Sequence, residues 1–427
     1  MALLTFSAES ALWREATWMN ILLIHQNFPA QFRHLAPALA ATGHQVVALT
    51  VNPPGESWHG VRIIRYADRL AAHARRQRNT MLDEWQSKVI RARAAAEAIQ
   101  ALRDEGFAPD VVFAHPGWGE ALFVRTVFPS ARLLVYAEYF YGTAGGDVGF
   151  DPEFSATTPE GSQRLILKNT HLLHALNSCD AALAPTAFQR ARHPDWAQDR
   201  IQVIHEGIDT GLFKPDASAW VQLKSAGLTL RHGDEVITFV ARQLEPYRGF
   251  HIFMRALPLI QMLRPNARVV LVGGDEVSYG APAPGGESWR KVLLKEVGSR
   301  IDLTRVHFVG RVPHQRLTQL MQVSAAHVYL TYPFVLSWSL LEAMSIGCLI
   351  VASDTAPVRE VITDGDNGLL TDFFDPEQLA ERVAYALENR TRLAHLREAA
   401  RASIQECYDL ATICLPKQLE FVLRNGR

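Results

Sequence analysis

Two arginines follow one apolar run of the chain, and their type and spacing suit the binding of phosphate. The run covers 236–241; after it come Arg242 and then Arg248, with Gly249 next to it. Each guanidinium keeps its charge and offers paired N–H donors that match phosphate oxygens. The segment is also typical of a turn that opens a helix, whose first N–H groups add partial positive charge. The alternative is a pair of surface arginines neutralised by Glu245, and chemistry alone does not separate the two.

A second segment, 331–347, leaves an apolar run and then starts a helix. Ser337, Trp338 and Ser339 stand at the expected helix start, where free backbone N–H groups bind anions. Glu342 follows in the first turn, and its carboxylate could accept hydrogen bonds from sugar hydroxyls. The alternative is a capping box, in which Glu342 bonds to the backbone of its own helix at Ser339.

Short apolar runs alternating with amphipathic segments must position these groups. Runs that are apolar on both faces predict buried parallel strands, and their alternation with helices in both halves predicts two doubly wound α/β domains. A helix is expected over 32–42. The expected strands are 21–24, 45–50, 110–114, 132–137, 181–184, 236–241, 267–272, 306–309, 327–331 and 349–352. Ligands of such sheets bind beyond the carboxyl ends of the strands, so the residues after strands are the candidates.

The strand pattern breaks near 210–233, which divides the chain. The expected parts are an extension over 1–18, an N-terminal domain over 19–212, a C-terminal domain over 213–405 and an amphipathic helical tail over 406–427. The extension has charged residues and no continuous apolar stretch, so it is not expected to be a secretory signal. The Gly- and Pro-rich stretch 275–288 predicts a long loop.

The composition excludes several classes of protein. Of the 427 residues, 48% are hydrophobic, which is enough for buried cores and excludes global disorder. The 43 Lys and Arg against 44 Asp and Glu give a net charge of −1, which argues against a nucleic-acid partner. The four cysteines lack metal-ligand spacing and fit reduced thiols in a cytosolic protein. No apolar run reaches the roughly 18 residues of a membrane span.

Together the motifs resemble those of the family 4 retaining glycosyltransferases with the GT-B fold. The segments that carry the resemblance are 242–249 for the diphosphate site, 340–353 for the nucleotide-sugar motif, 203–215 for the inter-domain segment and 26–44 for the N-terminal domain of one bacterial branch. The resemblance extends over nearly all of residues 19–427.

The resemblance implies a role for each matching residue. The expected catalytic residues are Arg242 and Arg248, which would neutralise the donor diphosphate, and His115, which would face the transferred sugar. The expected donor-binding residues are Glu342, which would bind the ribose hydroxyls, with Ser337, Trp338, Ser339 and Gly274. The expected acceptor-binding residues are Gln26, Asn27, Phe28 and Glu138. For His115, an ordinary loop histidine is the alternative.

Two positions depart from the family pattern. A glutamate that contacts the donor sugar usually stands eight residues before Glu342, and this chain has Phe334 there. The usual lysine of the diphosphate site is Arg248, which keeps the charge and changes the geometry. A literal Asp-Gly-Asp at 364–366, which binds a metal in a different glycosyltransferase fold, is followed by Asn-Gly and is interpreted as a turn.

We therefore expect a retaining enzyme that moves a sugar, a hexose by the resemblance, from a nucleoside-diphosphate donor to an acceptor hydroxyl. The donor would be UDP- or GDP-linked, the acceptor a carbohydrate or lipid-linked sugar of bacterial polysaccharide or glycoconjugate assembly, and no metal or other cofactor would be required. The alternatives are a GT-B-like nucleotide-sugar epimerase and a non-catalytic nucleotide-sugar-binding relative.

The segment 62–103 is basic, with ten Lys or Arg and four Asp or Glu. Its plain interpretation is a solvated helix face. The alternative is a surface for an anionic membrane or for a phosphorylated acceptor. The expected location is the cytoplasm, at or near the inner face of the membrane.

Overall fold

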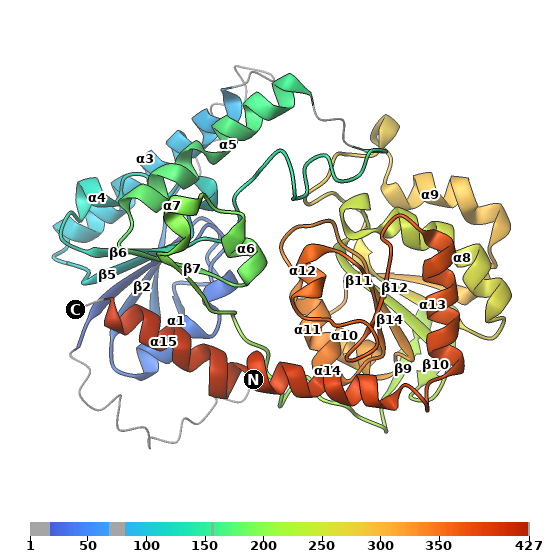
Figure 1. Cartoon of the computed structure of the whole chain (residues 1–427). Helices are drawn as coiled ribbons and strands as arrows, with labels where there is room; N and C mark the ends of the chain where they lie inside the picture. Colours follow the sequence, from blue (N-terminus) through green and yellow to red (C-terminus); the bar gives the residue numbers. More distant parts are fainter. Residues whose placement is uncertain (1–17, 68–81, 155–157, 426–427) are drawn as a thin grey trace.

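The computed structural model describes residues 18–67, 82–154 and 158–425, which form two α/β domains side by side (Figure 1). Almost all of the expected extension 1–18, and residues 68–81 of the basic segment, lie outside the described residues. Within the described ranges no helix combines the length and the apolarity that crossing a membrane requires.

The N-terminal sheet has eight strands in the order β3-β4-β2-β1-β5-β6-β7-β8, parallel except for the β3–β4 pair. The strands are β1 (Asn20–Ile24), β2 (Gln45–Thr50), β3 (Ser57–Trp58), β4 (Val61–Arg65), β5 (Val111–Ala114), β6 (Arg132–Tyr136), β7 (Ala181–Ala184) and β8 (Ile201–Val203). The helices of this domain are α1 (Leu35–Ala41), α3 (Asp83–Asp104), α4 (Val124–Val127), α5 (Pro159–Ser178), α6 (Ala187–Ala191) and α7 (Asp195–Gln198).

The C-terminal sheet has six parallel strands in the order β13-β12-β11-β14-β15-β16. The strands are β11 (Val236–Gln243), β12 (Arg268–Gly274), β13 (Val306–Gly310), β14 (Ala326–Tyr329), β15 (Ile350–Ser353) and β16 (Leu369–Thr371), and the separate hairpin is β9 (Trp220–Leu223) with β10 (Leu228–Arg231). The helices are α8 (Phe250–Leu263), α9 (Trp289–Val297), α10 (His314–Gln322), α11 (Trp338–Ile346), α12 (Ala356–Arg359), α13 (Pro376–Glu388) and α14 (Ala394–Cys407).

Both sheets reverse their strand order once, between β1 and β5 and between β11 and β14. Successive crossovers leave such a reversal point in opposite directions, so a crevice opens there at the carboxyl ends of the strands. The expected doubly wound architecture and the ten expected strands are confirmed, with ends displaced by at most two residues. The expected helix over 32–42 begins later, as α1 at Leu35, because a short 3₁₀ turn (Ala30–Phe32) precedes it.

The C-terminal tail joins the two domains. Helix α14 packs on α11 of the C-terminal domain, and α15 (Leu415–Arg424) continues along the N-terminal domain, as the red helices at the bottom of Figure 1 show. The apolar side chains Leu415, Leu419 and Val422 lie in one core cluster with Ile21 and Leu23 of β1. The amphipathic pattern of the tail is therefore used to cover the N-terminal domain.

The segment 139–154 of the N-terminal half also crosses, because its aromatic rings pack on the C-terminal domain. The Phe150 ring lies 5.2 Å from the rings of Tyr332 and of Phe373, centroid to centroid. Phe154 lies 4.9 Å from His251 on α8. This segment fixes the position of the two domains relative to each other.

Candidate active site

Arg248 lies at the centre of the C-terminal crevice, directly after β11. It ends a 3₁₀ turn (Pro246–Arg248) and is only 8% exposed. One guanidinium nitrogen, Nη1, donates to Thr331 Oγ1 at 2.8 Å and to the Val335 carbonyl at 3.1 Å. No ion pair joins Arg248 to a carboxylate among the described residues, so a buried positive charge lacks a protein counter-ion.

Gly249 is required for this placement of Arg248. Its φ is +66°, and a Cβ atom there would lie 2.3 Å from the Cβ of Leu330. Glu245 does not pair with either arginine in the described structure. Its buried carboxylate accepts hydrogen bonds from the backbone N–H groups of three residues in the 275–288 loop, at 3.0–3.3 Å. The surface-pair alternative for the arginines is therefore wrong, and the carboxylate instead holds that loop.

One tyrosine, Tyr329, connects Arg248 to the amino end of α11. The Tyr329 hydroxyl is 3.4 Å from Arg248 Nη1 and accepts the backbone N–H of Ser337 at 2.9 Å. Ser337 is the N-cap of α11, and its Oγ accepts the N–H of Ser339 at 3.3 Å. A buried guanidinium and a helix N-terminus are thus brought together, and both favour an anion.

Glu342 lies further along α11 and is 7% exposed. Its Oε1 is 3.2 Å from Nε2 of His314, the first residue of α10. The hydrogen bond to Glu342 raises the pKa of His314 above its ordinary value, while burial acts in the opposite direction. Ser337, and not Ser339, caps the helix, so the capping-box interpretation of Glu342 is not what the structure shows.

Three other expected donor-site residues lie on β11, β12 and α11. Arg242 is exposed on the last part of β11. Gly274 ends β12, where a Cβ would lie 2.2 Å from Gln243 Oε1, so a larger residue would require that side chain to move. Trp338 starts α11, and the guanidinium of Arg33, from the N-terminal domain, lies 5.7 Å from its ring centroid. Arg33 therefore faces the site from the opposite domain.

The N-terminal crevice holds a chain of four interacting side chains. His25 follows β1 and His115 follows the adjacent β5, and their ring centroids are 5.0 Å apart. His115 Nε2 lies 3.3 Å from Glu138 Oε2, and Gln31 Nε2 donates to Glu138 Oε1 at 2.7 Å. The other end of the Gln31 amide, Oε1, is 2.8 Å from His25 Nε2. The chain fixes the His115 ring at the mouth of the crevice.

The charges in this chain follow from its surroundings. Burial acts to raise the pKa of Glu138, but the hydrogen bonds and charge of His115 and Gln31 outweigh it and hold the pKa below its usual range. Burial, and then the neighbouring His115, lower the pKa of His25 well below its ordinary value. At neutral pH the Glu138 carboxylate is therefore ionised and the His25 imidazole is neutral.

The other expected acceptor residues lie in the loop after β1. Asn27 is exposed, and its Oδ1 accepts from Asn52 at 2.8 Å. The Gln26 carbonyl accepts from Thr50 Oγ1 at 2.8 Å. Phe28 is 2% exposed and packs edge-on against Trp58 at 5.5 Å, so its ring belongs to the domain core and not to the crevice surface. Of the four, Glu138 is the one that lines a cavity.

A cavity of about 300 Å³ lies where the N-terminal crevice meets the C-terminal domain. On the N-terminal side it is lined by His115, Trp118 and Glu138, and on the C-terminal side by Tyr279 and Phe334. Phe334 is 4% exposed, and its ring centroid lies 4.6–5.2 Å from those of three tyrosines, Tyr139, Tyr247 and Tyr279. The position of the usual glutamate is thus part of an aromatic cluster between the domains.

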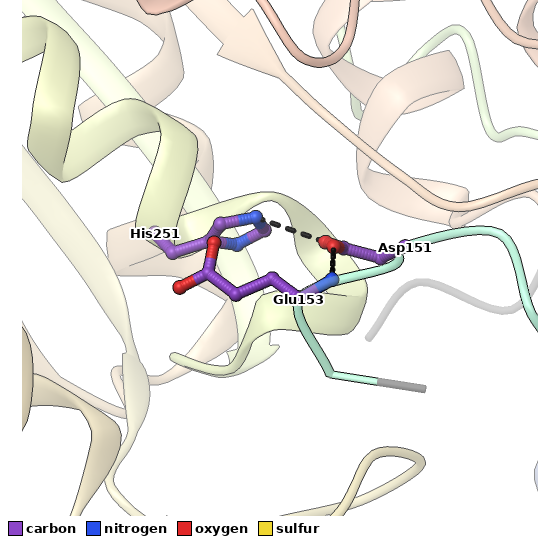
Figure 2. A group of neighbouring side chains, drawn as sticks. All are labelled: Asp151, Glu153 and His251. Atoms are coloured by element: carbon purple, nitrogen blue, oxygen red, sulfur yellow. Dashed lines mark hydrogen bonds and ion pairs between the residues drawn. The ribbon is translucent and has the colours of Figure 1, made fainter. Parts of the chain in front are cut away.

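Figure 2 shows Asp151, Glu153 and His251, whose potential metal-ligand atoms lie within 4.8 Å of one another. His251 Nε2 is 3.1 Å from Asp151 Oδ2, which also accepts from the Tyr332 hydroxyl at 2.8 Å. Both Glu153 oxygens are occupied by the Arg255 guanidinium, each at 2.7 Å. A divalent cation would have to displace that arginine, so the geometry favours an ion-paired joint between the domains over a metal centre.

Some of these residues carry a sequence signal and others do not. His25 follows a strand as His115 does, so the rule that selects residues after strands would have found it. Tyr279 lies in the 275–288 loop, whose Gly and Pro content marks it. Lys88 and Lys168, which also line the cavity, lie on two different helices and eighty positions apart in the chain, and no local pattern relates them.

The chain matches two family models in succession. Residues 42–213 match the glycosyl transferase family 4 group, and residues 222–403 match glycosyl transferases group 1. D-inositol 3-phosphate glycosyltransferase of Corynebacterium efficiens is 25% identical over 237 residues, which are 54% of this chain and 53% of that protein. The chain thus spans about half the length of the curated relatives of this kind that it matches.

Two solved structures share the architecture. Sucrose-phosphate synthase from Thermosynechococcus elongatus superposes with a TM-score of 0.71 at 19% identity, over 94% of this chain and 98% of that one. The HepE protein of Anabaena, in complex with UDP and glucose, superposes with a TM-score of 0.64 at 19% identity, over 95% of this chain and 99% of that one. With both halves matched by glycosyltransferase models and the two-domain fold shared throughout, the chain belongs to the family 4 glycosyltransferases with the GT-B fold.

Proposed function

We propose that the protein is a retaining glycosyltransferase that moves a sugar from a nucleoside diphosphate to the hydroxyl of an acceptor. The observation that carries the proposal is Arg248, a buried guanidinium without a described carboxylate partner, next to the capped amino end of α11. A charge buried in this way is costly unless an anion neutralises it, and a diphosphate supplies that anion.

The same groups would assist the reaction. As the bond between the sugar and the diphosphate breaks, negative charge grows on the leaving phosphate, and Arg248, Arg242 and the α11 N–H groups stabilise it. The acceptor oxygen bonds to the anomeric carbon on the face that the diphosphate leaves, and its proton passes to a leaving phosphate oxygen. Because the chain supplies this positive charge itself, the proposal assigns no role to a metal.

Other roles complete the proposal. Glu342 would accept hydrogen bonds from the ribose hydroxyls, and His115, fixed by Glu138, would face the transferred sugar. UDP is the first donor nucleotide to test, because HepE was solved with UDP and glucose, and GDP is the second. A hexose is the expected sugar.

The proposal also includes the acceptor and the location of the protein. The acceptor would be a carbohydrate or a lipid-linked sugar of bacterial polysaccharide or glycoconjugate assembly. We propose a cytoplasmic protein that contacts the inner face of the membrane through the basic segment 62–103, of which 62–67 and 82–103 are described.

Calorimetry with UDP, GDP and ADP, followed by NMR of UDP-glucose with and without acceptors, tests the proposal. We expect micromolar binding of one nucleotide and acceptor-dependent release of the diphosphate with retained anomeric configuration. An epimer formed from the donor alone would instead indicate an isomerase. Failure to bind any of the nucleotides would indicate a non-catalytic relative.

A further inference from the structure

One part of the lining of the 300 Å³ cavity is cationic, a property that the donor site does not use. Lys88 of α3 and Lys168 of α5 both line it, together with His171 one turn further along α5. These helices belong to the N-terminal domain, whereas Tyr279 and Phe334 come from the C-terminal domain. The cavity lining therefore combines aromatic rings at the junction of the domains with basic side chains of the N-terminal domain.

Among the residues that the structure describes, the two ammonium groups have few partners. Lys88 is 9% exposed, and its Nζ donates to the Gly117 carbonyl at 3.1 Å. Lys168 Nζ lies 3.6 Å from the centroid of the Tyr141 ring, and no hydrogen bond or ion pair joins it to another residue within the described ranges. An ammonium group has three donors, so most of this donor capacity remains open to a ligand.

The lowered pKa values of Lys88 and Lys168 also favour the binding of an anion. Burial lowers the pKa of both lysines, and the nearby charge that most opposes this is Glu84. Glu84 is exposed, lies one helical turn before Lys88 and also lines the cavity, so it is a weak counter-ion that can turn outward. The second lining carboxylate, Glu138, is already bonded to His115 and Gln31.

His171 adds a hydrogen-bond acceptor beside these donors. Burial, and then Lys88, lower the pKa of His171 to about 4, so the ring is neutral. Its Nε2 lies 3.1 Å from the Gly117 carbonyl, which requires the proton on that nitrogen. Nδ1 is buried without a hydrogen-bond partner among the described residues, so it offers an acceptor to a ligand hydroxyl.

We propose that this cavity binds the acceptor, and that the acceptor is a sugar or polyol phosphate whose phosphate lies between Lys88 and Lys168. The sugar or polyol ring would pack on the aromatic rings, with a hydroxyl directed towards the mouth. The Tyr279 ring lines the cavity and also lies 5.4 Å from the Arg248 guanidinium, so it separates the acceptor cavity from the donor phosphate site. A volume of about 300 Å³ suits a single sugar ring with its phosphate.

The assignment of the ligand as the acceptor rests on the proposed function, but phosphate binding in the cavity can be tested independently of it. Calorimetry would compare glucose 6-phosphate with glucose, in the presence and absence of UDP, on the full chain. We expect glucose 6-phosphate to bind at least about tenfold more tightly than glucose, since charge-assisted hydrogen bonds to phosphate supply that difference. Binding of glucose 6-phosphate without UDP binding would support the site and contradict the proposed function.

Variants locate the phosphate. Lys168→Met, and Lys88→Met if it folds, should remove the preference for glucose 6-phosphate and leave UDP binding unchanged. Glu84→Gln should tighten glucose 6-phosphate binding, because it removes the competing carboxylate, and a purely structural role for Glu84 would not. Lys295→Met is the matched control, since that lysine is 69% exposed on α9 and paired with Glu287.

Three results would overturn the proposal. The first is that neither glucose 6-phosphate at millimolar concentrations nor vesicles that contain phosphatidylinositol bind. The second is an unchanged affinity of Lys168→Met for glucose 6-phosphate. The third is that Arg248→Met loses glucose 6-phosphate binding while the lysine variants retain it. The last would place the phosphate in the donor site. Lys168-dependent binding of the vesicles alone would support the site and make its polyol phosphate lipid-borne.

Discussion

Replacing Arg248 with methionine separates a functional charge from a structural one. The side chain is 8% exposed and bonds to neutral groups only, the Thr331 hydroxyl, the Val335 carbonyl and the Tyr329 hydroxyl. Burial of the charge costs several kcal/mol, and its hydrogen bonds, at about 1.5–3 kcal/mol each, offset roughly that amount. Methionine has a similar length, so we expect the free energy of unfolding of the unliganded protein to change by less than about 2 kcal/mol.

The response to donor should change far more. Loss of a charged contact to the diphosphate weakens UDP binding by about 100-fold, from about 3 kcal/mol of lost interaction. At a UDP concentration of 100 times the wild-type Kd, the nucleotide stabilises the wild-type protein by about 2.7 kcal/mol, and the variant by about 0.4 kcal/mol. Turnover should fall by a factor of about 10²–10³, the usual loss on removing one transition-state donor.

Thermal unfolding with and without UDP measures both effects. Arg255→Met is the matched control, because Arg255 lies on the following helix and pairs with Glu153 and Glu296. It should lower the melting temperature and keep the UDP response. The reasoning is refuted if Arg248→Met melts much earlier than wild type and still responds to UDP, or if it keeps near-wild-type transfer rates.

Four further predictions concern other groups of the site. Glu342→Gln should weaken UDP binding about tenfold and return the pKa of His314 towards 6.5, which NMR titration would measure. Because the pKa of His314 is raised in the folded protein, the stability that the His314–Glu342 pair contributes is complete below pH 6.5 and is lost as the pH rises through the raised value. Asp151→Asn should destabilise the protein by about 3 kcal/mol near neutral pH, and because the pKa of Asp151 is lowered in the folded state, the difference from wild type should shrink below about pH 4 in denaturant titrations. Phe334→Glu should lower the melting temperature, because a carboxylate would be buried among tyrosine rings, and an unchanged melting temperature would show that the cluster opens readily. Transfer activity should persist in excess EDTA, whereas loss that added Mg²⁺ restores would contradict the metal-independent proposal.

The elements of the fold follow from local patterns in the sequence, and the joint between the domains does not. The apolar runs at 45–50 and 181–184 predict strands with the observed ends, because a strand buried on both faces needs nearly continuous apolar residues. The crossing segment 139–154 depends on pairs such as Tyr332 with Asp151, which are 181 residues apart in the chain. Neither residue has a neighbour in sequence that signals the other, so this contact appears only when the sheets are placed together.

The candidate site shows the same division. Arg248, Ser337 and Glu342 lie after strands or at a helix start, and the sequence selects them because such positions border the crevice of any doubly wound sheet. Their partners depend on tertiary structure. The sequence pairs Arg248 with Glu245 or with a ligand, and the structure gives that carboxylate to the 275–288 loop. Phe28 was expected in the acceptor site from its motif, but the turn after β1 directs its ring into the core.

Phe334 connects the departure from the family pattern to the architecture. A glutamate at this position would contact a donor sugar from the C-terminal domain, but here the ring packs on Tyr139 of the N-terminal half and on Tyr247 and Tyr279. The Tyr139 hydroxyl, in turn, lies 3.0 Å from the carbonyl of Pro333, the preceding residue. Where the resemblance predicts a polar donor contact, this chain thus has an apolar contact between the domains. Under the proposed function, the sugar would obtain its polar contacts from other groups that line the cavity, and among these Glu138 is an ionised carboxylate fixed beside His115.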